Sequence, residues 1–288
     1  MGEFNLSGFS KAITDLAERA GPAVASLALR RHTVSAFHWR DGFYAAPEEH
    51  LESDEEPGIT FEGGKTARGE LVGRDPSTGI ALIKAEGGDA ASFVPARNVS
   101  AGSVVVTVGR SGASPLAAFG LVGEAGPAWR SMRGGLIDRR IGLSTPIGGR
   151  FEGAAALDAE GGLIGMVLFG PRRRPLVIPA ETIDRVAKTL AEKGHVARGY
   201  LGAGLHPVRQ GTVRGAMVMS VDDDGPARNA GIHLGDIIMR WDGEAVEGPR
   251  DLIRRLGSDS VGTTVTLAIL RGGAEHTVSL TVGARPSH

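Results

Sequence analysis

The sequence of 288 residues contains no cysteine, carries almost no net charge and has no long apolar run. Without cysteine there is neither a disulfide nor a thiol nucleophile, so the composition does not indicate the redox compartment. No stretch approaches the roughly 20 consecutive apolar residues of a membrane-spanning helix. A formal net charge of −1 argues against a general binder of nucleic acid or of anionic membranes.

Glycine, in contrast, is abundant, with 44 residues. Turns between short strands consume glycine, so this content favours a mostly β architecture. The chain is long for a single core, because a domain usually has about 100 to 200 residues. Length and composition together predict two compact domains.

Two segments have the apolar spacing of helices. Residues 11–20 follow Ser10 and place apolar side chains at helical spacing before Gly21 and Pro22. Residues 180–193 do the same and are followed by Gly194, where a C-terminal cap is expected. Short apolar runs such as 104–108 and 162–168 alternate with glycine-rich turns and predict barrel strands.

The most informative segment is RFEGAAALDAEG, residues 150–161. It resembles the turn that presents the nucleophile in HtrA (DegP-like) proteases, a family with a trypsin-like double β-barrel followed by a PDZ domain. The family frame is matched without gaps by Phe151, Gly153, Leu157, Asp158, Gly161, Ile164 and Gly165. Arg150, Ala154 and Ala155 depart from it, and Glu152 stands where the family has its serine.

The same resemblance places the other two triad positions. The family aspartate that orients the catalytic histidine corresponds to Gly79, and Asp75 lies four residues earlier, at a different family position. The family histidine corresponds to His50. Of the three vestigial triad positions, His50, Gly79 and Glu152, only the first keeps the family residue.

A serine triad needs all three members, because the acid fixes the imidazole and the imidazole accepts the serine proton. A carboxylate at position 152 supplies no hydroxyl that can attack a carbonyl. The sequence therefore predicts a pseudoprotease with no catalytic residue and no enzymatic activity. Ser144 is the one nearby hydroxyl in a comparable setting, but no glycine pair follows it.

The chain after residue 198 resembles a PDZ domain, a fold that binds an extended C-terminal peptide as an added strand. The resemblance implies that Tyr200, Leu201, Gly202 and Ala203 offer N–H groups to the peptide carboxylate. Ile253, on a helix expected over 249–256, is the expected groove wall, while Leu252 and Leu256 face the core. A closing strand is expected over 265–271.

The resulting division is an N-terminal extension over 1–22, a trypsin-like double barrel over 23–193, a linker over 194–199 and a PDZ domain over 200–286. The expected function is a peptide-binding scaffold or regulator. A weak, atypical hydrolase that uses His50 and Glu152 with water, and a chaperone-like holdase, remain as alternatives. No cofactor or metal is expected.

Two further questions stay open at the level of sequence. Glu152 and His50 either form an ion pair that plugs the cleft or lie apart with the carboxylate in solvent. The family often forms trimers through N-terminal residues, so the first helix either assembles the protein or packs on its own barrel. Because Met1–Asn5 shows no signal segment, the chain as it stands is expected in the cytoplasm, or in the periplasm if a signal peptide was removed.

Overall fold

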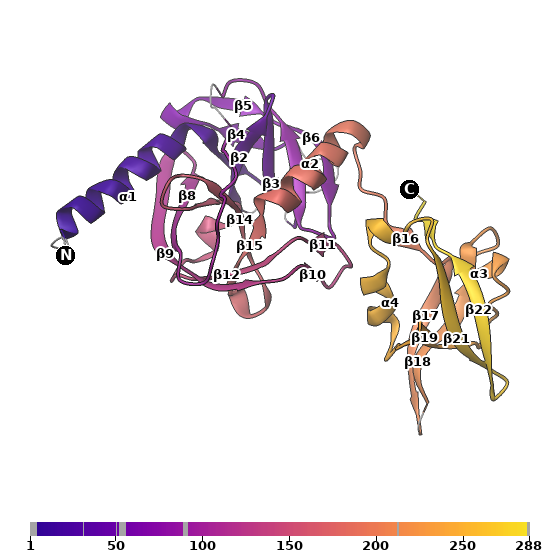
Figure 1. Cartoon of the computed structure of the whole chain (residues 1–288). Coiled ribbons are helices and arrows are strands. Elements are labelled where there is room, and N and C mark those ends of the chain that lie inside the picture. The colour runs from indigo at the N-terminus through magenta and orange to yellow at the C-terminus, as the bar shows by residue number, and fades with distance from the viewer. Residues whose placement is uncertain are drawn as a thin grey trace. The chain divides into compact units, whose positions relative to one another are not determined.

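The computed structural model describes residues 5–30, 32–49, 51, 56–88, 92–211 and 213–286. The chain forms two compact units, Met1–Trp129 with Ile137–Val196 and Arg130–Leu136 with Ala197–His288 (Figure 1). Strands dominate both units, which confirms the predicted mostly β fold class. No helix in the described ranges combines the length and apolar character needed to cross a bilayer.

The first half of the first unit is an antiparallel sheet of seven strands in the order β5-β4-β1-β2-β3-β7-β6. Side chains alternate between its faces, so Tyr44 and Ala46 enter one buried cluster while Ala45 enters another. The strands are β1 (Val24–Ala28), β2 (Thr33–Arg40), β3 (Phe43–Pro47), β4 (Gly58–Thr60), β5 (Thr66–Arg68), β6 (Glu70–Asp75) and β7 (Ile80–Lys84).

The second half of this unit closes into a barrel of six strands in the order β12-β15-β14-β13-β8-β9. The predicted strands 104–108 and 162–168 are both present, the first extended to Ser111 and the second running over 163–169. The barrel strands are β8 (Val104–Ser111), β9 (Ser114–Gly126), β12 (Arg140–Ser144), β13 (Ala155–Leu157), β14 (Leu163–Phe169) and β15 (Pro175–Pro179). Between β9 and β12 in the chain lies the pair β10 (Trp129–Arg130) and β11 (Leu136–Ile137).

The two sheets of the first unit share one apolar core. It joins Phe37, Ile80 and Leu82 of the first sheet to Val106, Met166 and other residues of the barrel. The predicted helix over 180–193 is confirmed as α2 (Ala180–Lys193), and Gly194 caps it in the left-handed conformation at φ 72°. This helix contacts β6, β7 and β14, so it covers the seam between the two sheets.

The N-terminal helix is longer than the sequence pattern predicts. It is α1 (Leu6–Ala20), and Asn5 rather than Ser10 caps it, its side-chain oxygen accepting from the N–H groups of Ser7 and Gly8. Leu16 and Ala20 enter the shared core, and the rings of Phe9 and Phe119 meet edge to face at 5.0 Å. The helix thus packs on its own barrel through these residues.

The second unit is an antiparallel sheet in the order β17-β18-β19-β21-β22 with two short helices. The expected closing strand starts one residue earlier than predicted and is not the last strand, since β22 follows it at the edge of the sheet. The helix expected over 249–256 ends at Arg255, because Leu256 leaves the helical conformation at ψ 47°. The elements are β16 (Gly199–Tyr200), β17 (Ala203–Gln210), β18 (Val213–Val221), α3 (Pro226–Asn229), β19 (Ile237–Trp241), β20 (Glu244–Ala245), α4 (Pro249–Arg255), β21 (Thr264–Arg271), β22 (Ala274–Thr281) and β23 (Gly283–Ala284).

Candidate functional site

The segment that carries Glu152 is a tight turn at the mouth of the barrel. Residues Gly149–Phe151 form one turn of 3-10 helix, Glu152 ends it in an extended conformation, and Gly153 takes φ 80° before β13 begins. The N–H of Gly153 donates to Val167 O at 2.8 Å, which joins the turn to β14. The turn is thereby part of the barrel wall, with the Glu152 side chain half-buried.

A second contact fixes this turn against the other sheet. The N–H of Ser35, on β2, donates to Glu152 O at 2.8 Å. A Cβ at Gly153 would lie only 1.9 Å from Ser35 O, so no other residue fits there without a shift of the main chain. The glycine is required both by its positive φ and by this close approach. Sequence reasoning did not find Ser35, which is far from the turn in sequence.

Two main-chain donors of this turn are used inside it. The Glu152 N–H donates to Gly149 O at 3.1 Å and the Ala154 N–H donates to Phe151 O at 3.0 Å. Stabilising an oxyanion takes donors aimed at the developing charge, not at the carbonyls of their own turn. An oxyanion bound at this place would require residues 149–152 to open.

Gly79 lies in the turn between β6 and β7 at φ 78°. Its N–H donates to Asp75 O at 2.9 Å, and a Cβ at this position would lie 2.9 Å from the Leu168 side chain. The nearest atom is the end of a flexible side chain, so the positive φ is the stronger reason for glycine at this position. The Asp75 carboxylate accepts hydrogen bonds from Ser77 and Thr78 within the same turn.

His50 lies outside the described residues, but the segment around it is held in place. The N–H of Glu48 donates to Gly79 O at 3.0 Å, and Arg74 donates to Leu51 O at 2.7 Å. The Glu48 carboxylate, only 6% exposed for the residue, lies 3.7 Å from the Arg74 guanidinium. Glu48 is therefore a buried acid beside the Gly79 turn and two residues from His50, a feature that the motif comparison missed.

The alternative nucleophile has a different setting. Ser144 ends β12 and pairs with Leu121 of β9, so it belongs to a regular ladder. Its side chain is exposed. The structure does not bring it into a turn like that of Glu152.

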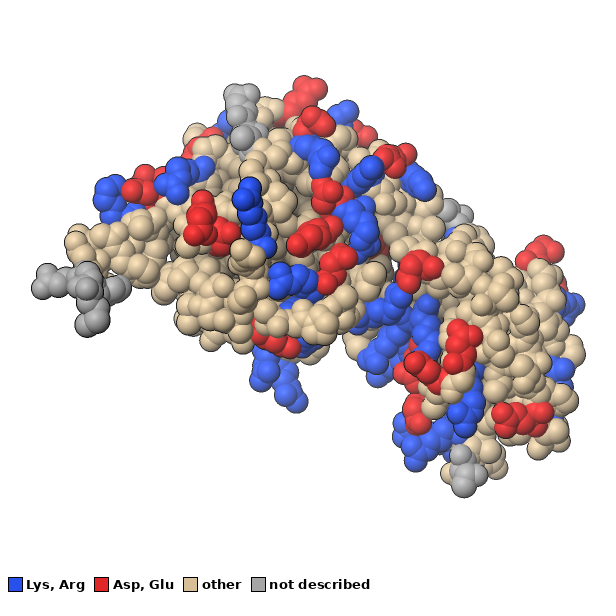
Figure 2. Space-filling model, in the orientation of Figure 1, with Lys and Arg blue, Asp and Glu red and all other residues tan. Residues whose placement is uncertain are grey.

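Charged side chains on the surface alternate in sign. Figure 2 shows acidic and basic residues interspersed over the visible face of the first unit. Several form pairs, among them Arg40 with Asp184 and Arg140 with Glu124. Exposed pairs of this kind contribute little to stability. The first unit thus presents no broad field of one sign on this face.

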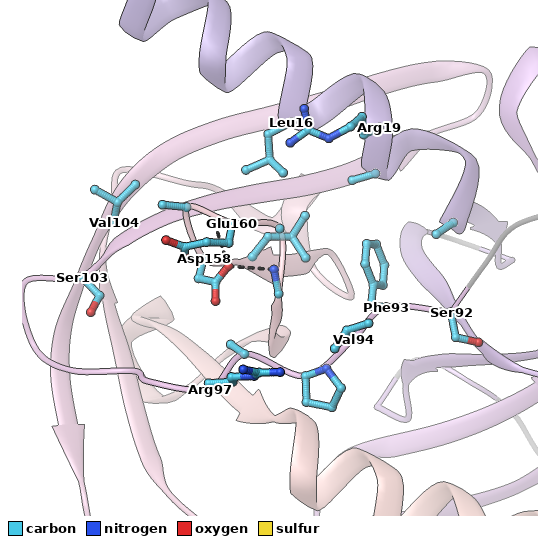
Figure 3. Close-up of a pocket in the computed structure, with 18 of the residues that line it drawn as sticks. Leu16, Arg19, Ser92, Phe93, Val94, Arg97, Ser103, Val104, Asp158 and Glu160 are labelled. Atoms are coloured by element: carbon cyan, nitrogen blue, oxygen red, sulfur yellow. Dashed lines mark hydrogen bonds between the residues drawn. The ribbon is translucent and has the colours of Figure 1, made fainter.

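A cavity of about 920 Å³ opens elsewhere on the first unit (Figure 3). Its walls come from the end of α1, the segment 92–98 and the turn 158–162. Arg19 and Arg97 lie on opposite sides of it, and Asp158 lies between them. The Asp158 carboxylate holds its own turn, accepting from the N–H groups of Glu160 at 3.0 Å and Gly162 at 2.7 Å. Glu152 is not among the lining residues, so this cavity is separate from the nucleophile turn.

In the second unit the predicted peptide-binding residues come together around a loop. Tyr200 lies in β16, paired with Gly283, and Ala203 begins β17. The carbonyls of Leu201 and Gly202 accept from the N–H groups of Ala227 at 2.7 Å and Asp222 at 2.9 Å. The loop is thus fixed through its acceptors.

A sheet edge and a helix adjoin this loop. Among the described strands, β17 pairs only with β18, and α4 contacts β17 (Figure 1). Leu252 is fully buried and Leu256 packs against the core, as predicted. Ile253 keeps 42% of its surface exposed on α4. An apolar floor beside a sheet edge suits an extended peptide.

Comparisons with known proteins agree with both units. Residues 34–166 match the trypsin-like peptidase domain family, and residues 199–282 match the PDZ domain family. The chain is 29% identical over 273 residues to the probable periplasmic serine endoprotease DegP-like of Brucella suis biovar 1 (strain 1330), which covers 88% of this chain and 53% of that protein. The protein of the same name from Rhizobium meliloti (strain 1021) is 28% identical over 293 residues, covering 94% and 57%. The chain spans about half the length of the curated relatives it matches.

Solved structures show the same fold. The structure described as HtrA-type protease AlgW with decapeptide has a TM-score of 0.71 at 21% identity and covers 96% of this chain and 99% of its own. The serine endoprotease from Yersinia pestis has a TM-score of 0.71 at 24% identity and covers 95% and 98%. At such identities the likeness establishes the fold alone.

These comparisons contradict one expectation from the sequence. The replacement of the family serine by Glu152 and of the family aspartate by Gly79 led to the prediction that the chain is not an enzyme, whereas the similar relatives are named serine endoproteases. The structural neighbours are also described as proteases. The similarity points to a protease, so the prediction that the chain is not an enzyme does not stand.

Proposed function

Because the chain is HtrA/DegP-like, with a trypsin-like peptidase domain followed by a PDZ domain, we propose that it binds polypeptides and that the PDZ groove holds their extended C-terminal ends. The observation that carries this proposal is the open edge of β17 next to the fixed loop of Leu201, Gly202 and Ala203. An extended chain can add to such an edge through main-chain hydrogen bonds. The similar HtrA-type protease AlgW, which is described with a decapeptide, agrees with this role.

Each predicted residue has a distinct part in the proposed groove. The N–H groups of Leu201, Gly202 and Ala203 face the terminal carboxylate, while Tyr200 fixes the start of the loop through β16. Ile253 contributes to the wall on α4. Gly202 has φ 71°, and a Cβ there would lie 2.8 Å from the Gly225 Cα, so the loop keeps its shape only with glycine at this position.

The test compares a labelled peptide with a free C-terminus and the same peptide amidated at its C-terminus, measured against the full chain by fluorescence anisotropy. The free carboxylate should bind more tightly, because the amide replaces a charged acceptor of hydrogen bonds. Replacing Gly202 by Ala should weaken the binding of the free-carboxylate peptide and leave that of the amidated peptide little changed. Equal binding of acid and amide would reject the groove as a carboxylate site.

A second candidate function, hydrolysis of peptide bonds in the barrel cleft, is favoured by the names of the relatives. The positions that correspond to the triad are His50, Gly79 and Glu152, so any hydrolysis there must use an attacking group other than a serine at position 152. In the mechanism that suits a carboxylate, Glu152 accepts a proton from water, and the water oxygen attacks the carbonyl carbon. The C–N bond of the tetrahedral intermediate then breaks as the Glu152 carboxyl returns its proton to the leaving amine. The turn 149–152 has to open to free a donor for the resulting oxyanion.

Cleavage of casein by the full chain, and by Glu152→Gln and Glu152→Ser variants, tests this candidate. A water-based mechanism loses activity in Glu152→Gln, since the amide cannot accept the proton, and wild-type protein stays unlabelled by a fluorophosphonate that reacts with activated serines. Labelling of the wild type would point instead to a serine such as Ser144. Casein that is bound but not cut would favour holding of unfolded segments, the third function considered from the sequence.

Two further properties follow only from the family likeness. We propose a periplasmic location, because the relatives are named periplasmic, and a homo-trimer, because the family often assembles in this way. Cell fractionation and light scattering of the purified full chain test them separately.

A further inference from the structure

The open edge of the proposed peptide groove has a defined direction of its main-chain groups. The N–H of Gly204 donates to Ser220 Oγ on β18 at 3.1 Å, so Gly204 points toward β18. Across the ladder, Leu205 lies opposite Val218, whose N–H and C=O bond to Asp236 and Gly235 on the other side. Leu205 therefore has no ladder bond to β18, and its main-chain groups point to the open edge.

Residues along a strand alternate in the direction of their N–H and C=O groups. On β17 the residues that face the open edge are thus Ala203, Leu205, Pro207 and, beyond the proline, Arg209. The first two have an N–H to offer to an added strand. Proline has no N–H. An edge strand tolerates proline where the missing N–H would point away from the sheet.

The main-chain carbonyl oxygen of Pro207 already accepts a hydrogen bond. The Nδ1 atom of His206 lies 3.0 Å from Pro207 O, and since a carbonyl only accepts, the imidazole donates. Pro207 also lies next to the start of α4, because a Cβ at Gly248 would be 3.8 Å from the Pro207 Cβ. At this point the edge of β17 offers no donor, and its acceptor is already engaged by the His206 side chain.

We infer that His206 and Pro207 end strand addition on β17, so the groove reads only the last three residues of a peptide C-terminus through main-chain bonds. This inference rests on the proposed function of the groove. A carboxylate at the loop places the last peptide residue beside Ala203 and makes the peptide run back along β17. Alternate pairing then puts the third residue from the end beside Leu205 and the fifth beside Pro207.

The ligand is accordingly a short C-terminal segment whose upstream residues need not be extended. Affinity should rise with peptide length up to three residues and then level off. A substitution that restores the donor at position 207 should continue the ladder. One additional net hydrogen bond is expected to tighten binding about two- to tenfold.

The test uses alanine-rich peptides of three, four and six residues, each ending in leucine with a free carboxylate, measured against the full chain by calorimetry. In the wild type the affinity of the six-residue peptide should lie within about twofold of that of the three-residue peptide. The Pro207→Ala variant, alone and with His206→Ala, should gain about two- to tenfold for the six-residue peptide only. Val208→Ala is the matched control, because it trims the next side chain and adds no donor.

The outcomes separate this inference from the function on which it rests. If no peptide with a free carboxylate binds, the proposed function and this inference both fail. If the peptides bind but wild-type affinity climbs more than about twofold from three to six residues, only the limit at Pro207 is wrong. The wild-type series tests the limit at Pro207 even if a variant does not fold. Equal affinity of the three-residue peptide for wild type and variant shows that the groove of the variant is intact.

Discussion

At the residue scale, the turn of Glu152 depends on its neighbour more than on the glutamate itself. Gly153 combines a positive φ with a contact that leaves no space for a Cβ. Any side chain there must push Ser35 O away and break the bond that joins the turn to β2. The main-chain conformation at position 152 therefore depends on Gly153 and Ser35, not on the glutamate side chain.

Replacing Gly153 by Ala should therefore destabilise the first unit by about 3 kcal/mol or more, from backbone strain and overpacking together. Urea unfolding followed by circular dichroism measures the loss. Gly102 is the matched control, since it has φ 90° but nothing within 4 Å of its Cβ position. Gly102→Ala should cost only the strain, about 1 kcal/mol. Equal losses for the two variants would contradict the close contact at Gly153.

His38 gives the first unit a dependence on pH. Burial lowers the pKa of its imidazole below the ordinary value of 6.5, although Asp41 acts in the opposite direction. The ring accepts from the Gly42 N–H at 3.3 Å, which suits the neutral form. Above about pH 6.5 the ring is neutral in both folded and unfolded chains. As pH falls, the unfolded chain binds the proton first, so the free energy of unfolding decreases until the folded pKa is passed.

The measurable consequence is a smaller loss of stability between pH 7.5 and pH 5 in His38→Gln than in the wild type. The amide of Gln can keep an acceptor near Gly42 and does not titrate. His276, which is exposed on β22, serves as control, and His276→Gln should follow the wild type. If His38→Gln also follows it, the imidazole does not cause the dependence.

At the scale of elements, an ion pair in the second unit joins the partly exposed Arg271 of β21 to Asp236, the buried residue just before β19. Arg271 on β21 donates to both carboxylate oxygens of Asp236, at 2.8 and 2.6 Å, and the His233 N–H donates as well. Burial alone would raise the pKa of the Asp236 carboxyl, but the hydrogen bonds from Arg271 and His233, with the Arg271 charge, hold it below its ordinary value. Its contribution to stability is complete above about pH 3.8 and disappears as pH falls through the lowered pKa.

We expect Asp236→Asn to destabilise the second unit by about 2 to 3 kcal/mol at pH 7, because Arg271 loses its charged partner while Asp236 is 1% exposed. Glu247→Gln is the matched control, since it removes one charge of an exposed pair with Arg214 and should cost less than about 0.5 kcal/mol. Thermal unfolding of both variants measures the difference. A loss in Asp236→Asn no larger than that in Glu247→Gln would refute the structural role of the pair.

Elements with a strong local pattern were predictable from the sequence, and contacts between distant segments were not. Residues 180–193 carry both a helical stripe and a glycine cap, so their bounds were correct. The start of α1 was missed because Leu6 is 70% exposed and Phe9 packs on Phe119, more than a hundred residues away. Likewise the motif located the Glu152 turn, but it could not show that Ser35 bonds to that turn or that the buried Glu48 bonds to Gly79. Both contacts form only when the chain folds.

At the scale of the whole molecule, each unit has a core of its own. One apolar cluster, built around Trp241, Leu252 and Ile269, serves the second unit, and three others serve the first. Units that bury separate cores unfold as separate cooperative transitions. The effects of substitutions should then remain within the unit that carries them.

Calorimetry of the full chain should accordingly resolve two transitions. Gly153→Ala should lower the midpoint of one, Asp236→Asn should lower the midpoint of the other, and the double variant should show both shifts without interaction, as expected for distant sites. Binding of a free-carboxylate peptide should raise only the transition that Asp236→Asn lowers, because a ligand stabilises the folded unit that holds it. A single transition that both substitutions move together would mean that the two cores unfold as one. Calorimetry could then not attribute the stabilisation by the peptide to one unit.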